Sequence, residues 1–229
     1  MRYSLKLLVC GVLAAATAAC QMPIHTTPVS LVSPAADKVQ AALDHWPKAS
    51  SQASPIKRPF FATVHAAGRR VTASGVLEYY SPRDFRITAV TEVGALLFDG
   101  RVNWAGVTVL REMPGMDKSV VETILSDMAE AFEVPSDIEG LGASAEGLVL
   151  HRKAGDTHEH TWIFDPRTGR LMETEVDLGA FDTLHVDYRG YTPFGWPEEL
   201  VITRKARLYD ISFTFTDTMV QGNSHGNMQ

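Results

Sequence analysis

The chain has 229 residues, of which 45% are hydrophobic and 21% charged, and its formal net charge at pH 7 is −6. This length and composition suit one globular domain of ordinary apolar content. The acidic balance and the lack of a basic cluster in the sequence argue against binding to nucleic acid and against electrostatic docking to anionic lipid.

The N-terminus has the pattern of an exported protein. Arg2 and Lys6 precede an apolar run, residues 7–16, which is followed by small residues and then Cys20. The run is too short to cross a bilayer, so residues 1–19 are predicted to be a signal peptide. Their ending resembles a bacterial lipobox, which implies acylation of Cys20, although Thr17 stands where such signals usually carry Leu. The alternative is an ordinary signal peptide with an incidental cysteine.

The other cysteine, Cys10, lies in the segment that would be removed, so the mature chain would contain Cys20 and no disulfide. Without Arg2 and Lys6, 19 of the 21 basic residues remain against 27 acidic ones, and the net charge becomes −8. In similar lipoproteins an Asp after the cysteine causes inner-membrane retention, so Gln21 favours the outer membrane. Residues 20–34 contain three prolines and are predicted to be the acylated cysteine and a flexible tether.

The middle of the chain, Val71–Arg111, contains four runs in which apolar and polar residues nearly alternate. Alternation interrupted by turn residues is typical of consecutive antiparallel strands with one buried face. A further strand is expected over residues 60–66, after a connector over residues 48–59. The turns of the central β-meander are predicted at Ser81–Asp84, Glu92–Gly94 and Asp99–Gly100.

Two helices are predicted. The first covers residues 35–46, and the second lies in the segment 113–132, with Asp117 as its N-cap. In the second helix one face is apolar and must cover another part of the protein. That face contains Met116, Val120, Val121, Ile124, Leu125, Met128 and Phe132, whereas the polar face contains Lys118, Glu122, Asp127 and Glu130.

A Gly-rich loop is expected at residues 138–143, and strands follow at residues 147–152, 160–164, 171–176, 181–188, 200–205 and 207–216. About eleven strands with short connections predict an α+β, mainly antiparallel fold, because parallel strands need long crossovers. A sheet of that size must curl, so residues 35–221 are predicted to form a curved, unclosed β-barrel with helices capping its concave side. The tail, residues 222–229, is predicted to be disordered.

The concave face of such a sheet is expected to be an apolar trough that binds a ligand. Its predicted lining comes from the central meander and the second helix. The candidate lining residues are Phe85, Ile87, Leu96, Phe98, Trp104, Val120, Ile124 and Met128.

Residues 80–94 (YSPRDFRITAVTEVG) resemble a strand–turn–strand segment of the LolA/LolB group, which sorts lipoproteins in the bacterial envelope. Residues 188–220 also fit the ending of that group, with Tyr191-Thr192-Pro193 and Trp196-Pro197 before two strands. The resemblance implies an unclosed barrel whose helical lid covers a cavity for acyl chains. It also implies an outer-membrane lipoprotein whose domain faces the periplasm, supplied by a LolA-like carrier.

In LolB an apolar residue of the loop before a glycine delivers the lipoprotein to the membrane. Val93 occupies that position here and is smaller than the usual leucine. The same residues resemble a lesser-known group of LolB-like lipoproteins encoded near fatty-acid or polyene synthesis genes. In that case the cargo would be a lipid-like product.

The polar motif His158-Glu159-His160 fits a solvated hairpin turn better than a metal site, because no second histidine pair has matching spacing. His185 and Asp187 share a strand face without an evident partner. No nucleophile with a base, phosphate-binding loop or dinucleotide motif is present in the sequence, so we expect no enzyme, metal or cofactor. The alternatives are a structural lipoprotein whose trough is filled by its own side chains, and a lipoprotein hydrolase with a Ser or His cluster.

Overall fold

The computed structural model describes residues 55–66, 68–133, 140–143, 147–152, 158–193 and 195–216. These residues form twelve strands and one helix, α3 (Lys118–Ala131). The predicted signal peptide, Cys20, the predicted tether, the helix predicted at residues 35–46 and the predicted C-terminal tail all lie outside the described residues.

Five strands precede α3 and seven follow it. Those before it are β1 (Ile56–Ala66), β2 (Arg69–Ser81), β3 (Asp84–Val90), β4 (Leu96–Asn103) and β5 (Gly106–Glu112). Those after it are β6 (Gly140–Ala143), β7 (Leu148–Arg152), β8 (Glu159–Phe164), β9 (Leu171–Asp177), β10 (Thr183–Tyr191), β11 (Pro197–Arg204) and β12 (Tyr209–Phe215).

All twelve strands belong to one antiparallel sheet with the order β5-β4-β3-β2-β1-β12-β11-β10-β9-β8-β7-β6. Strands that are neighbours in the chain pair with each other, except β5 and β6, and the two halves of the sheet join where β1 pairs with β12 and brings Phe60 opposite Phe215. The sheet ends at β5 and β6, so it is curved but unclosed. The predicted fold class is thereby confirmed.

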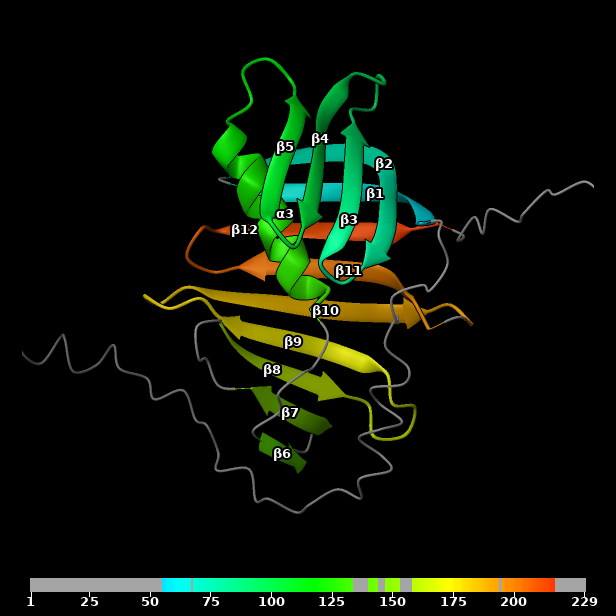
Figure 1. Ribbon diagram of the computed structural model, residues 1–229, viewed down its shortest axis with the longest axis vertical. Coiled ribbons are helices and arrows are strands. Elements are labelled where there is room, and N and C mark those ends of the chain that lie inside the picture. The colour runs from blue at the N-terminus through cyan, green and yellow to red at the C-terminus, as the bar shows by residue number, and fades with distance from the viewer. Residues whose placement is uncertain are drawn as a thin grey trace, which may run out of the picture. The chain divides into compact units, whose positions relative to one another are not determined.

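Helix α3 lies on the concave side of this sheet. Figure 1 shows α3 between the β3–β5 strands and the β10–β12 strands, which run across each other because the sheet curves. Asp117 caps its N-terminus by accepting a hydrogen bond from the backbone N–H of Ser119 at 2.9 Å, as predicted. Its buried residues are Val121, Leu125, Asp127, Met128 and Ala131.

The assignment of Asp127 to the polar, solvent-facing side of this helix is wrong. Its side chain is buried and 2% exposed, whereas Val120, which was assigned to the apolar face, is 50% exposed. A helix enclosed by a curved sheet is contacted on more than one side, so a two-sided division of its residues into buried and exposed fails. The buried carboxylate must therefore find partners in the sheet.

The turn predicted at Asp99–Gly100 is also wrong, because β4 continues through both residues and the turn lies at Trp104–Ala105. Asp99 is buried and accepts hydrogen bonds from Arg86 and Arg111, which pair it across the sheet. A Cβ atom on Gly100 would lie 2.4 Å from Cδ1 of Leu125. The glycine therefore leaves room for α3 to approach the strand.

Two further boundaries differ from the expectation. Residues 140–143 lie in strand β6, not in a loop, which accounts for the additional strand. Strand β1 begins at Ile56, so the last part of the predicted connector is extended and paired with β2. In both segments the sequence favours a loop only weakly, and pairing with a neighbouring strand makes the backbone extended.

Aromatic side chains link α3 to the sheet at its C-terminal end. The ring of Phe132 lies 5.5 Å from the rings of both Tyr79 and Phe85, in edge-to-face geometry. Tyr79 in turn contacts Trp196, with the ring centroids 4.8 Å apart. Such pairs stabilise the fold by about 0.5–1.5 kcal/mol each beyond the area they bury.

Candidate functional site

The concave face of the sheet, together with the helix that covers it, is the candidate ligand site. Of the predicted lining residues, Phe85, Ile87, Phe98 and Met128 are buried in the core. Leu96 and Ile124 are partly buried. Their burial follows from the strand alternation on β3 and the helical spacing on α3.

The remaining predicted site residues lie at the surface. Trp104 is 79% exposed on the β4–β5 turn, Val120 is 50% exposed on α3, and Val93 is 90% exposed on the β3–β4 turn. Trp104 was predicted to line the site by extending the strand alternation, but β4 ends one residue earlier, at Asn103. The exposed position of Val93 leaves its side chain accessible to a membrane or a partner.

Ionic contacts hold the middle of α3. Arg204 of β11 donates hydrogen bonds to Asp127 at 2.7 Å and to Asp182 at 2.7 Å, and Tyr209 donates to the other oxygen of Asp127. Burial raises the pKa of Asp127 to about 6, and the charge of Arg204 opposes this increase. Asp127 is therefore a buried acid whose pKa lies above the usual range of a carboxyl.

A second polar cluster holds the next turn of the helix. Glu130 contacts His158 at 3.0 Å and His160 at 2.9 Å, and the His160 ring stacks on Trp162 with the centroids 5.1 Å apart. Burial by itself would raise the pKa of Glu130, but the hydrogen bonds from the two histidines hold it below its usual value.

The prediction of a solvated turn at this motif is wrong for His160, which is 1% exposed. Groups of three or more metal-binding side chains do not occur within the part of the chain that the structure describes. Both histidines point to one carboxylate of α3, so they act here as tethers of the helix.

The C-terminal end of α3 has two further tethers. The hydroxyl of Tyr188 donates to the backbone oxygen of Ala131 at 2.6 Å, and Nε of Arg83 donates to Glu133 at 2.6 Å. Sequence reasoning missed all of these contacts, because their partners are far apart in the chain. The available signal was weak: acidic residues at positions 127, 130 and 133 recur every three residues along α3 and just past its end.

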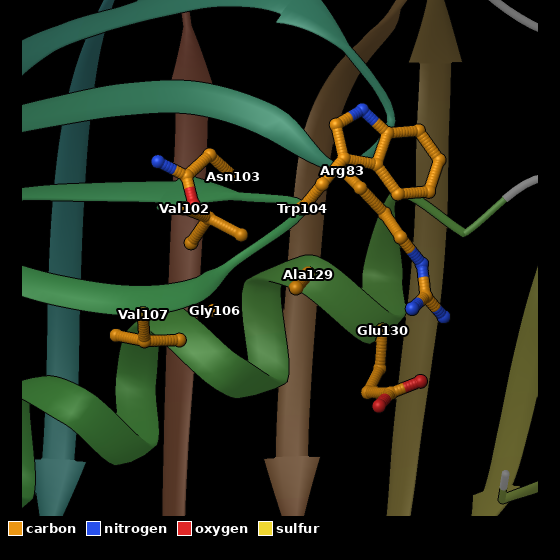
Figure 2. Close-up of a pocket in the computed structure, with 8 residues that line it drawn as sticks. All are labelled: Arg83, Val102, Asn103, Trp104, Gly106, Val107, Ala129 and Glu130. Carbon is orange, nitrogen blue, oxygen red and sulfur yellow. The ribbon is translucent and has the colours of Figure 1, made fainter. Parts of the chain in front are cut away.

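The pocket found beside α3 among the described residues is small. A pocket of about 140 Å³ lies between the helix and the β4–β5 hairpin, and Figure 2 shows the Arg83 and Glu130 side chains at one end of it. A cavity of about 150 Å³ accommodates a single benzene ring, so this pocket is too small for a long acyl chain. It is lined by Arg83, Val102, Asn103, Trp104, Gly106, Val107, Ala129 and Glu130.

No protein-family model and no curated protein matches this sequence. Among solved structures, the chain is similar to a LolA superfamily protein from Nitrosomonas europaea, with 8% identity, a TM-score of 0.54, and coverage of 80% of this chain and 92% of that one.

Two more distant similarities cover 83% of this chain and 94% of the other chain. One is to a DUF1329 family protein from Desulfovibrio piger, with 9% identity and a TM-score of 0.46. The other is to a domain named for outer-membrane lipoprotein sorting from Vibrio parahaemolyticus, with 10% identity and a TM-score of 0.47.

The similarity to the Nitrosomonas protein concerns the fold, which is LolA-like: a curved, unclosed antiparallel sheet with a helix on its concave side. It assigns no residue a role, because 8% identity carries no correspondence of side chains. Helix α3, the helix of the described residues, does not have the length and apolar character needed to cross a membrane.

Proposed function

We propose that this protein binds acyl chains, or another apolar ligand, on the concave face of the sheet in the place that α3 occupies. The observation that carries the proposal is that one 14-residue helix covers an apolar concave face of a single sheet. The ligand enters when α3 moves away, because the pocket beside the helix is too small to hold a chain.

The energies of apolar burial can be compared for the two occupants. Burying a methylene group contributes about 0.8 kcal/mol, so an acyl chain of about fourteen methylenes contributes about 11 kcal/mol. The large apolar side chains that α3 buries, Val121, Leu125 and Met128, together with Phe132, contribute about 6–12 kcal/mol at 1.5–3 kcal/mol each. The apolar burial of the two occupants is therefore of similar size, and the contacts of Asp127 and Glu130 with the sheet add to the cost of displacing the helix.

In this proposal the protein transfers its ligand without catalysis, as an outer-membrane lipoprotein anchored through Cys20 with its domain in the periplasm. A periplasmic LolA-like carrier supplies the acyl chains, and the exposed Val93 contacts the membrane during delivery. Support comes from the lipobox-like N-terminus and from the LolA-like fold.

The test uses the mature chain, residues 20–229, with Cys20→Ser, purified from the periplasm and extracted for mass spectrometry. We expect co-purified lipid, or uptake of added palmitate together with faster amide hydrogen exchange in α3 than in β10. Protein that holds no lipid and takes up no palmitate would contradict the proposal.

A second candidate function is the binding of a protein partner by a lipoprotein without a lipid cavity. Its support is that side chains of the described residues pack into a core on the face that α3 covers. This candidate predicts lipid-free protein in which added palmitate leaves the amide exchange of α3 unchanged. The same experiment therefore distinguishes the two functions.

A further inference from the structure

Arg58, near the start of β1, is buried on the concave side of the sheet with few partners. Its side chain is 1% exposed, and Phe60 and Ala62 are buried at the next alternate positions of the strand, whereas Phe61 between them is 62% exposed. Strand alternation thus places Arg58 on the face that α3 covers. A buried guanidinium at that position requires an explanation.

The guanidinium forms one hydrogen bond, from Nη1 to the backbone oxygen of Pro197 at 2.9 Å. Its Nε and Nη2 atoms are buried, and neither has a hydrogen-bond partner among the described residues. Aromatic rings surround it: its central carbon lies 4.3 Å from the ring centroid of Phe215 and 5.4 Å from that of Trp196.

The charge of Arg58 is poorly compensated. Burial lowers its pKa to about 10, and the exposed Glu198 opposes this decrease only through space. The side chain nevertheless stays protonated at neutral pH. Two buried donors without acceptors destabilise a folded protein, so a role in ligand binding explains their presence better than a role in stability.

We infer that Arg58 binds the anionic group, carboxylate or phosphate, of a ligand whose alkyl chain lies on the concave face. Nε and Nη2 are the two donors on one side of a guanidinium, and together they match two oxygens of a carboxylate or phosphate. The inference rests on the proposed function, and it adds the chemical class of the ligand head group and the residue that recognises it.

The position of Arg58 suits a head group at the end of an alkyl chain. Trp196 contacts both Arg58 and Tyr79, and Tyr79 contacts Phe132 at the C-terminal end of α3. A chain that replaces α3 can therefore extend past Phe132 and place its anionic end at Arg58. Because Arg58 is 1% exposed, a side chain that covers it, such as Phe215 or Trp196, must move for the anion to reach Nε and Nη2.

The test measures the affinity of the Cys20→Ser mature chain for two pairs of ligands, by displacement of a fluorescent fatty acid. Palmitate is compared with hexadecanol, and lysophosphatidate is compared with neutral monopalmitoylglycerol. The variants are Arg58→Met, which keeps the volume but removes the charge, and Arg58→Lys, which keeps the charge but removes the paired donors. Lys57→Met is the control, since Lys57 is half-buried and pairs with Glu78 at 2.9 Å.

We expect the unsubstituted protein to prefer the anionic member of a pair by at least about tenfold, as a charge-assisted pair of hydrogen bonds requires. Arg58→Met should abolish that preference and leave the affinity for the neutral member within about threefold, and Arg58→Lys should retain part of it. A larger loss of preference in Arg58→Met for palmitate over hexadecanol identifies the head group as a carboxylate. A larger loss for lysophosphatidate over monopalmitoylglycerol identifies it as a phosphate.

Three outcomes would overturn the inference. The first is an Arg58→Met protein that keeps the preference for the anionic ligand. The second is an equal loss in Lys57→Met, which would indicate a general effect of charge. The third is the absence of any preference in the unsubstituted protein. Binding of hexadecanol in any of these cases leaves the proposed function intact, whereas failure of all four ligands to bind contradicts both.

Discussion

The two ends of strand β11 involve two arginine side chains in opposite environments: Arg204, which is partly buried, and Arg58, which is buried. At its last residue, Arg204 donates to the carboxylates of Asp127 and Asp182, each at 2.7 Å. At its first residue, Pro197, the backbone oxygen accepts a single hydrogen bond from Arg58. Burial alone would lower the pKa of both arginines. The two carboxylates raise the pKa of Arg204 above its usual value, whereas the pKa of Arg58 falls to about 10.

The difference indicates that buried charge serves two purposes in this fold. A cation with two carboxylate partners attaches α3 to the sheet and contributes to stability only as part of that group. A cation without a carboxylate partner leaves donors available for a ligand. The four predictions below test this contrast by separating stability from binding.

The largest effect is expected from Arg204→Met, which leaves the carboxylate of Asp127 buried beside Tyr209 without a cation. Loss of one partner of a buried pair should lower the free energy of unfolding by about 3–5 kcal/mol. Arg58→Met, in contrast, should leave it unchanged or raise it. Urea titrations of both variants check this, with Arg69→Met, at an exposed position of β2, as control. Equal destabilisation by Arg58→Met would remove the contrast between the two ends of β11.

The next effect concerns pH and Asp127, whose pKa is about 6 in the folded protein and about 3.8 in the unfolded chain. Between these values the folded state holds a proton that the unfolded state releases. The stability contributed by this carboxyl is therefore present below about pH 4 and is lost as the pH rises to about 6. Its size is about 3 kcal/mol, because one pKa unit corresponds to about 1.4 kcal/mol.

The measurement is the free energy of unfolding between pH 4 and pH 7, compared with Asp127→Asn. The difference between the two proteins should change by about 2.4 kcal/mol over this pH range, in the direction just given. Other acidic groups contribute equally to both proteins and cancel in the difference. A constant difference across this range would show that Asp127 is already ionised in the folded protein at pH 4.

A smaller effect is expected from Gly100→Ala, because its new Cβ would meet Leu125 of α3 at 2.4 Å. Overpacking of this kind costs about 1–3 kcal/mol. The Leu125→Ala background should relieve the overlap, so a double-mutant cycle should show a favourable coupling between the two substitutions. In addition, palmitate uptake should become faster in Gly100→Ala if displacement of α3 admits the ligand. Additive effects would indicate that strand and helix do not press on each other.

The smallest effect on stability is expected from Val93→Glu, since Val93 is 90% exposed on the β3–β4 turn. The free energy of unfolding should change by no more than about 0.5 kcal/mol. Transfer of bound palmitate to phosphatidylethanolamine vesicles should nevertheless slow, because a charged residue opposes contact with the membrane interior. Unchanged transfer would exclude a delivery role for this turn and would leave the contrast between Arg58 and Arg204 unaffected.

Much of the fold could be predicted from local pattern. Alternation identified β3 by Phe85 and Ile87, and helical spacing identified Leu125 and Met128 as buried. The turn predicted at Asp99–Gly100 was wrong because an Asp-Gly pair favours a turn only where tertiary contacts do not hold both residues in a strand. The prediction of lining residues near strand ends, such as Trp104, required the position where the strand ends, and alternation does not define that position.

The sequence by itself determined that the chain forms a large antiparallel sheet with an amphipathic helix, because both periodicities are local properties of the chain. Only the tertiary structure decided which polar residues are buried and with what partners. Asp127 and Arg204 are 77 positions apart, and Arg58 and Pro197 are 139 positions apart. Both contacts exist because β1 pairs with β12 and the sheet curves around α3, an arrangement that no local pattern encodes.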